Sequence, residues 1–420
     1  MNISKGLFFR WHDSLVYDRI VQMELKRSYF NKLLSEITDP EISILVGARQ
    51  VGKSTLLRSL QTQAEKKGYR THFYNLELST DLQELSGDQK SVLNQLTKNG
   101  QVVFIDEFHY LPNAFKIFKA LFDSKAKVKI YASGSSSIEI HKHLKESLAG
   151  RFTKTFIQPL SWTEFQTVPH ATFSDYCVWG GLPGLLHRKN HDTKLDLLEN
   201  IVSTYITKDV KALIKEENIR AFNSMLYLLA QAQGQVTVVA NLARETGLTE
   251  ATIARHLEIL SQTYVAHVVT SYSANLANEL KKSKKYYLYD LGIRNHLLKD
   301  YRPVLERKDQ GAILESFVYL HLLRQIKPNM EIRFWRTKKG NEVDFIVIKN
   351  RIPFPIEVKS KLQKPEIPAS IKMFLDRYSD SPGAIVFNES LKEIVTYKEK
   401  PVQFLPWQEA VKIDYLQSML

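Results

Sequence analysis

Residues 42–57, ISILVGARQVGKSTLL, constrain the fold of this chain more than any other stretch. An apolar, β-branched run leads into Gly47-x-x-x-x-Gly52-Lys53-Ser54, and a helical pattern of leucines follows. The glycines let successive backbone N–H groups turn toward phosphate oxygens, and the start of the helix adds its positive dipole end. The order of strand, loop and helix therefore predicts a phosphate-binding loop.

The side chains of this loop have separate expected roles. Lys53 reaches the β and γ phosphates, where it acts in binding and in catalysis, and Ser54 ligates Mg²⁺. The predicted nucleotide-binding residues are Gly47, Arg49, Gly52, Lys53, Ser54 and Thr55. ATP and Mg²⁺ are the predicted cofactors. A glycine turn that binds no nucleotide is the alternative, and the complete motif disfavours it.

A second, acidic element supports the phosphate site. Residues 101–112, QVVFIDEFHYLP, are an apolar strand that ends in Asp106 and Glu107. We expect Asp106 to hold the Mg²⁺ and Glu107 to polarise the attacking water as general base. An exposed acidic strand end is the alternative. The glutamate beside the aspartate favours hydrolysis over binding alone.

Two further polar positions are candidates for the hydrolysis site. Residues 128–137, VKIYASGSSS, run from an apolar strand into small polar residues, and Ser135 is the hydroxyl expected to sense the γ-phosphate. The segment SLAGRF offers Arg151 as a finger that acts on a neighbouring subunit, a role worth roughly 10³–10⁵ in rate. A plain Ser/Gly turn and a surface arginine are the alternatives.

Strand and helix patterns alternate from residue 42 to about residue 160, which predicts a parallel sheet with helices on both faces. The expected strands lie near 42–46, 70–76, 102–106, 128–133 and 154–158. An amphipathic helix at 15–37 precedes them, and a helical stretch at 175–230 follows. The fold class is therefore α/β with a helical extension.

Residues 235–290 have a different pattern. They predict a helix, a turn at Gly247, a second helix with Thr249 as N-cap and an apolar β-hairpin, which together are typical of a winged helix. In a DNA-binding module the second helix would present three side chains to a groove: Thr252, Arg255 and His256. The wing would bring four lysines to phosphates: Lys281, Lys282, Lys284 and Lys285. A packing module with a solvated lysine run is the alternative.

The last unit begins near residue 303 and combines carboxylates with a lysine. Residues 341–361, NEVDFIVIKNRIPFPIEVKSK, place Asp344 and Glu357 on neighbouring strands and Lys359 two residues further on, while a helix upstream carries Glu315. This order is that of a restriction-endonuclease-like core, in which the acids hold a divalent metal and the lysine orients water. A charged β-ribbon that binds DNA without cleaving it is the alternative.

The composition favours a polyanionic partner or a bound phosphate ligand. The 420 residues include 58 Lys+Arg against 45 Asp+Glu, a net charge of +13. No stretch approaches the roughly 18 uncharged apolar residues of a membrane span, so no membrane partner is expected. The N-terminus lacks a secretory pattern, and the single cysteine, Cys177, fits a reducing cytoplasm.

Together these motifs resemble one family, the bacterial and archaeal AAA-type ATPases that carry a C-terminal domain of unknown function with a nuclease-like core. The resemblance rests on GARQVGKST, FIDEFHYLP, SGSSS, SLAGRF, WGGLPG, YLYDLGIRN and NEVDF…IEVKS. It implies an AAA-type P-loop ATPase domain at 1–165, a helical region at 166–230, a winged helix at 231–302 and a restriction-endonuclease-like domain at 303–420. Lys208 stands where an arginine is common, and lysine cannot supply its bidentate fork.

Three functions are open at this stage. The leading hypothesis is a cytoplasmic, oligomeric, DNA-dependent ATPase, for which a hexameric ring is one form. The second is an ATP-gated nuclease with a second divalent metal in the C-terminal domain. The third is a nucleotide-controlled switch that binds another protein and has no activity on DNA.

Overall fold

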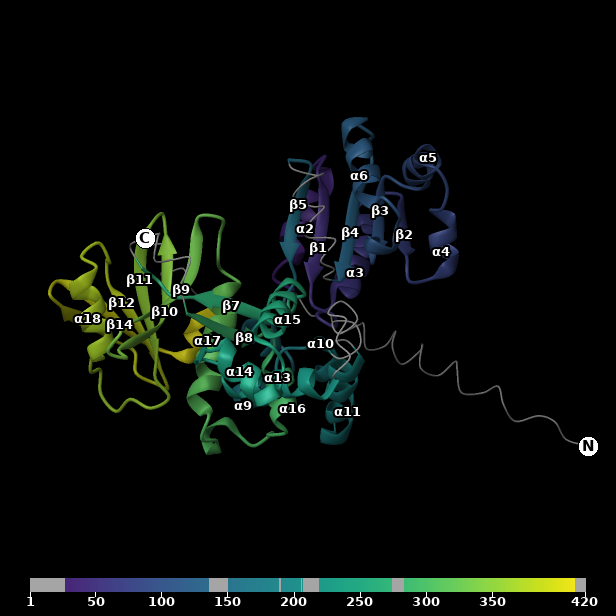
Figure 1. Cartoon of the computed structure of the whole chain (residues 1–420). Helices are drawn as coiled ribbons and strands as arrows, with labels where there is room; N and C mark the ends of the chain where they lie inside the picture. The colour runs from purple at the N-terminus through teal and green to yellow at the C-terminus, as the bar shows by residue number, and fades with distance from the viewer. Residues whose placement is uncertain are drawn as a thin grey trace, which may run out of the picture.

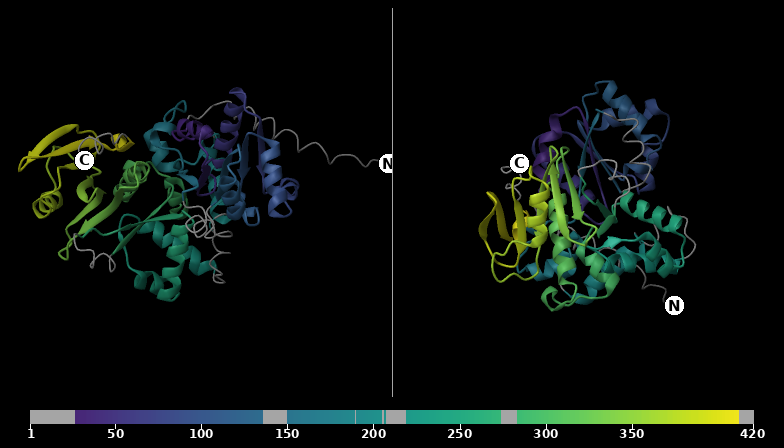
Figure 2. Two further views of the ribbon diagram at one scale, coloured as in Figure 1. Left: turned by 90° about the horizontal axis from the view of Figure 1, so that it is seen from above. Right: turned by 60° about the vertical axis from the view of Figure 1, so that its left-hand side comes forward.

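The computed structural model describes residues 27–135, 150–188, 190–204, 206, 219–273 and 283–411. Within these ranges the strands form sheets of five, six and three strands. The five-stranded sheet (purple to blue) and the six-stranded sheet (green to yellow) lie apart, and teal elements from the middle of the chain lie between them (Figure 1; further views in Figure 2). No helix in the described ranges is long and apolar enough to cross a membrane.

The five-stranded sheet is parallel throughout, in the order β2-β3-β4-β1-β5. Its strands are β1 (Ile42–Gly47), β2 (Thr71–Asn75), β3 (Val102–Asp106), β4 (Lys129–Ser135) and β5 (Phe152–Phe156). All five lie close to the bounds predicted from the sequence, because each is a short apolar run next to turn residues. Since β1 lies inside the sheet, the loop that follows it emerges at the carboxyl edge among the ends of its neighbours.

Helices cover both faces of this sheet. Side chains of a strand alternate between faces, so Ile44 belongs to one core cluster and Leu45 to the other. The helices of this region are α2 (Phe30–Ser35), α3 (Lys53–Lys66), α4 (Ser79–Glu84), α5 (Gln89–Asn99) and α6 (Ala114–Asp123). Helices α2 and α3 pack on the Leu45 side, and α5 and α6 pack on the Ile44 side. Of the helix expected at 15–37, residues 15–26 lie outside the described ranges.

The middle of the chain is mainly helical, as expected. Its elements are α8 (Trp162–Phe165), α9 (Phe173–Trp179), α10 (Pro183–Leu186), α11 (His191–Ile201), α13 (Ile219–Gln231), β6 (Val236–Thr237), α14 (Val239–Thr246), α15 (Glu250–Gln262), β7 (Ala266–Thr270) and β8 (Lys284–Leu288). Gly247 ends α14 in the left-handed conformation, and the Thr249 hydroxyl accepts the Thr252 N–H at 3.1 Å. The predicted turn and N-cap are therefore confirmed.

The C-terminal sheet is mixed, in the order β13-β14-β12-β11-β10-β9. The elements of this part are α16 (Leu291–Leu298), α17 (Gln310–Leu323), β9 (Met330–Arg336), β10 (Glu342–Lys349), β11 (Ile352–Val358), α18 (Ala369–Arg377), β12 (Ala384–Asn388), β13 (Glu393–Tyr397) and β14 (Lys400–Pro406). Helices α17 and α18 belong to two different core clusters, one on each side of the sheet. Ser271, just after β7, bridges to Phe334 of β9, which joins the three-stranded sheet to the edge of this one.

A buried carboxylate joins the WGGLPG and YLYDLGIRN segments. Asp290 accepts the N–H groups of Gly181 (2.8 Å), Gly292 (2.8 Å) and Ile293 (3.2 Å). Burial raises the pKa of Asp290 to about 6, although these N–H groups act in the opposite direction. A Cβ at Gly180 would lie 2.1 Å from Asp290 Oδ1, so this glycine allows the close approach.

We predict that Asp290→Ala lowers the free energy of unfolding by about 2–4 kcal/mol, because it removes the cap of α16 and leaves buried N–H groups unsatisfied. Chemical denaturation monitored by circular dichroism measures the change. Asp88→Ala is the matched control, because Asp88 caps α5 at an exposed position and its loss costs about 1 kcal/mol. If the two variants lowered the free energy of unfolding by the same amount, this role of Asp290 would be contradicted.

Candidate functional site

The loop between β1 and α3 has the backbone that its glycines predict. Gln50 (φ 64) and Gly52 (φ 89) are left-handed, which turns neighbouring N–H groups toward the inside of the loop. A Cβ at Gly47 would lie 2.1 Å from the carbonyl oxygen of Ile157. The segment after β5 therefore packs directly against the first residue of the loop.

Lys53 is held at the centre of this loop. Its ammonium donates to the carbonyl oxygens of Gly47 (3.1 Å) and Ala48 (2.9 Å), and the residue is 5% exposed. Burial lowers the pKa of Lys53, and the charges of Glu107 and Asp106 act against that shift. Since an ammonium has three hydrogens, a further acceptor such as a phosphate oxygen can be bound.

The predicted acidic strand end lies within electrostatic reach of Lys53. Asp106 is buried at the end of β3, and the Ser133 hydroxyl of β4 donates to its Oδ1. Glu107 has left-handed backbone (φ 53), an uncommon conformation for a non-glycine residue that recurs at functional sites. His109 Nδ1 lies 3.2 Å from Glu107 Oε2. Asp106 is thus oriented by a hydroxyl, and the carboxylate of Glu107 lies close to an imidazole.

The other predicted residues of the ATP site occupy the same edge of the sheet. Ser54 and Thr55 are exposed in the first turn of α3, and Arg49 is half-buried in the loop. The backbone of Ser135 pairs in register with that of Gly47, at the start of the loop. The oxygens of Ser54 and Asp106 are of the ligand type that Mg²⁺ takes, so these residues fit the predicted metal.

Arg151 lies at the opposite edge of the sheet. Its carbonyl accepts the N–H of Ile42 at 3.1 Å, and its Nε lies 2.8 Å from Asp123 Oδ1. Strand β1 separates this edge from the loop and spans about 17 Å, at roughly 3.3 Å for each residue. Arg151 therefore does not reach the phosphate loop of its own chain.

The sequence analysis missed three residues of a charged cluster beside the phosphate loop, of which Arg27 contacts the loop itself. Arg27 donates to the carbonyl of Val51 in the loop, and its Nε lies 3.3 Å from buried Glu164. Arg324, at the end of α17, lies 4.0 Å from the same carboxylate. The capping-box pattern Ser161-x-x-Glu164 was visible in the sequence and predicts the start of α8, but it does not predict the two arginines.

The four residues of the predicted nuclease core are brought together in the C-terminal domain. The pKa of Glu315 is raised to about 7 and that of Glu357 to about 8. Burial is the larger cause in both residues, and the negative charge of Asp344 is the second. The pKa of Asp344 is also raised by burial, against the effects of Lys285 and of Lys359. The negative charge of Asp344 therefore acts on both glutamates.

Each of these acids already has a partner within the protein. Glu315 accepts from Lys285 (3.3 Å) and from the Tyr287 hydroxyl (2.5 Å). Lys359 donates to Glu357 at 2.6 Å, and the Val358 N–H donates to Asp344 at 2.8 Å. In the part of the chain that the structure describes, no three His, Cys, Asp or Glu side chains are placed to hold one metal ion. One carboxylate oxygen of this group, Glu357 Oε2, is buried without a hydrogen-bond partner, so the predicted second metal stays a prediction.

The structure also corrects two of the predicted DNA contacts. Lys285 is fully buried, with its ammonium 2.6 Å from Glu342, because alternation along β8 turns Lys285 inward and Lys284 outward. The prediction that Lys285 contacts phosphates is therefore wrong. His256 is 2% exposed and faces the core, whereas Arg255 beside it is exposed. Lys281, Lys282 and Lys208 lie outside the described residues.

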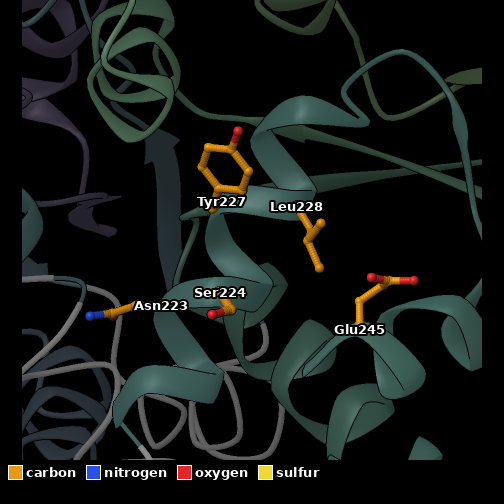
Figure 3. A pocket seen from close by; sticks show the side chains of 5 residues that line it. All are labelled: Asn223, Ser224, Tyr227, Leu228 and Glu245. Atoms are coloured by element: carbon orange, nitrogen blue, oxygen red, sulfur yellow. The ribbon is translucent and has the colours of Figure 1, made fainter. Parts of the chain in front are cut away.

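An open hollow of about 440 Å³ lies between α13 and α14. Asn223, Ser224, Tyr227 and Leu228 of α13 line one side, and Glu245 of α14 lies opposite them (Figure 3). The hollow contains none of the residues predicted to bind nucleotide, metal or DNA.

Three segments of the chain match known families. Residues 39–166 match an AAA domain, residues 170–302 match a domain of unknown function (DUF8612), and residues 310–409 match a second domain of unknown function (DUF4143). An uncharacterized protein of Mycobacterium tuberculosis is 27% identical over 82% of this chain and 76% of its own length. Another, from Methanocaldococcus jannaschii, is 26% identical over 87% of both chains.

Among solved structures, the Aeropyrum pernix ORC1 protein in complex with DNA matches with 12% identity and a TM-score of 0.29, over 65% of this chain and 92% of its own. AMPPCP-bound DnaA from Aquifex aeolicus matches with 15% identity and a TM-score of 0.29, over 62% of this chain and 90% of its own. Similarity at this level carries no argument about function.

We predict that the carboxylates of the C-terminal core make the protein less stable as pH rises. The pKa of Glu357 in the folded protein, about 8, lies above its ordinary value of 4.5, so the folded state binds this proton more tightly. The stability from that proton is complete below about pH 4.5 and is lost as pH rises through 8. In EDTA, melting temperatures between pH 5 and 9 should fall less steeply for Glu357→Gln than for wild type.

Glu366→Gln is the control for this experiment, since Glu366 is exposed and its partner Lys364 is exposed too. Its melting curve should follow that of wild type at each pH. Parallel pH profiles for wild type and Glu357→Gln would contradict the assignment of a bound proton to this core.

Proposed function

We propose that this chain, in which residues 39–166 match an AAA domain and residues 310–409 match a domain of unknown function, hydrolyses ATP to ADP and phosphate. The observation that carries the proposal is the grouping of Lys53, Asp106 and Glu107 at one edge of a parallel β2-β3-β4-β1-β5 sheet. A loop that only bound nucleotide would not need a glutamate oriented beside the metal-binding aspartate.

Each group at this site has a separate role in the proposed reaction. Inward-facing N–H groups of the loop and the N-terminus of α3 bind the phosphates, and Lys53 neutralises charge on the β and γ groups. Ser54 and Asp106 hold Mg²⁺, which supplies further positive charge to the phosphates when it is bound. Glu107 accepts a proton from the attacking water, and its carboxylate lies 3.2 Å from His109 Nδ1.

We further propose that hydrolysis is coupled to DNA. Exposed cations support this: Arg255 on the second helix of the winged-helix-like module, Lys284 on its wing, and Lys338 and Lys339 in the turn between β9 and β10. Such side chains favour a polyanion, and the net charge of +13 has the same effect at longer range.

The position of Arg151 leads us to propose that the protein acts as an oligomer. This residue is separated from its own phosphate loop by the length of β1, so it can assist hydrolysis only in a neighbouring subunit. To do so, Arg151 would have to leave its ion pair with Asp123 (2.8 Å) and contact the phosphate of a nucleotide bound to that neighbour. The single cysteine, Cys177, is buried and unpaired, which suits a reducing compartment such as the cytoplasm.

We predict that Glu107→Gln lowers kcat for ATP at least about 100-fold, as expected for loss of a general base, while ATP is still bound. Lys53→Ala should weaken ATP binding itself, because it removes the cation from the loop. Phosphate release and titration calorimetry measure the two effects, with Glu366→Gln as the control. A Glu107→Gln protein that hydrolyses ATP at the wild-type rate would exclude this mechanism.

DNA coupling is tested with the same phosphate-release assay. Linear, forked and four-way-junction DNA are added at low and moderate salt, and we expect at least one form to stimulate wild-type hydrolysis severalfold. The stimulation should decrease with salt and in the double variant Arg255→Ala/Lys284→Ala. Hydrolysis that no DNA form changes would instead favour the protein-binding switch.

A further inference from the structure

Arg27 contacts the phosphate loop from outside. Its Nη1 donates to the carbonyl oxygen of Val51 at 2.8 Å, and its Nη2 donates to that of Gln158 at 2.6 Å. Its Nε lies 3.3 Å from Glu164 Oε1, and the side chain is 8% exposed. One guanidinium therefore joins the loop, the segment after β5 and the start of α8.

The contact with Val51 also fixes the next N–H group. The Val51 carbonyl and the Gly52 N–H belong to one planar trans peptide, in which the two groups point in opposite directions. When Arg27 holds the carbonyl outward, the Gly52 N–H is directed to the other side, into the loop. Gly52 is left-handed (φ 89), a conformation that glycine adopts without steric cost.

Glu164 holds Arg27 in this position. Its Oε1 accepts the Ser28 N–H at 2.7 Å and the Ser28 hydroxyl at 2.9 Å, and its Oε2 accepts the Ser161 N–H at 2.8 Å. Burial would raise the pKa of Glu164, but Arg27, Arg324 and these N–H groups outweigh burial and lower it. The carboxylate is therefore charged and hydrogen-bonded on both oxygens.

The same carboxylate connects the loop to the C-terminal domain. Arg324, which follows α17, lies 4.0 Å from Glu164 Oε2 and donates to the carbonyl of Pro159. His321 of α17 accepts the N–H of Trp162, in the first turn of α8, at 2.8 Å. Two side chains from this end of α17 thus hold the segment that contacts Arg27.

We propose that Arg27 is a positioning residue for ATP hydrolysis, which aligns the Gly52 N–H with the phosphates through the Val51 peptide and is itself held by Glu164. The inference rests on the proposed ATPase function. Arg27 touches no phosphate in this account and acts only through the loop. Loss of Arg27 should therefore lower kcat while nucleotide is still bound, because the phosphates are less well aligned. Loss of Lys53, in contrast, should weaken nucleotide binding itself.

The test compares Arg27→Lys with wild type in steady-state ATP hydrolysis. Lysine keeps the positive charge beside Glu164 but cannot span the carbonyls of Val51 and Gln158 as the guanidinium does. We expect kcat to fall about 10-fold, less than the 10²–10³-fold known for complete loss of a transition-state donor, with KM changed about twofold. Arg58→Lys is the control, because Arg58 lies on α3 and contacts only the ring of Phe73 in this region.

Two further variants separate positioning from folding. Arg27→Ala should regain part of its lost kcat in millimolar guanidinium, which can occupy the vacated contact, and Arg27→Lys should not respond. Glu164→Gln, which keeps Arg27 but removes the charge that holds it, should lower kcat severalfold. Thermal unfolding of each variant shows that it is folded at the assay temperature.

The outcomes distinguish this inference from the proposed function. A wild-type protein without ATPase activity would overturn both. If the wild type hydrolyses ATP and the kcat of Arg27→Lys is within twofold of the wild-type value, only the role of Arg27 would be overturned. A loss confined to KM would also contradict it, because that result would assign Arg27 to nucleotide binding rather than to alignment.

Discussion

The buried carboxylate of Glu164 is the interaction on which the arrangement of the nucleotide site depends. It brings together Arg27, from the start of the described chain, and Arg324, from the end of α17, at a position that is only 4% exposed. An unpaired charge at such a depth costs several kcal/mol, so neither arginine can leave without a large penalty to the carboxylate. The phosphate loop, the segment after β5 and the C-terminal domain are thus held in one ion-paired cluster.

A second buried cluster of charged residues surrounds Lys285. Lys285 lies among Glu315, Glu342 and Asp344, and burial, which lowers the pKa of Lys285, is outweighed by these acids, so that it stays charged. Lys285 of β8 is therefore joined by this ion cluster to Glu315 of α17 and to Glu342 of β10.

The sequence predicted the local features well. The five parallel strands, the loop between β1 and α3 and the Thr249 cap each depend on residues close together in the chain, where apolar periodicity and turn chemistry decide the structure. The contacts it could not predict join distant residues: Arg27 and Glu164 are 137 positions apart. Lys285 was misassigned for the same reason, since the acids that bury it lie on other elements and a lysine run alone suggests a solvated surface.

The central claim is that the phosphate loop and α17 are connected through Glu164, and hydrogen exchange tests it most directly. Exchange is measured by mass spectrometry with and without a non-hydrolysable ATP analogue and Mg²⁺. The account predicts slower exchange in the loop at 47–55, in the segment at 157–165 and in the last turns of α17 near Arg324. Protection confined to the loop, with 157–165 and 310–324 unchanged, would contradict it.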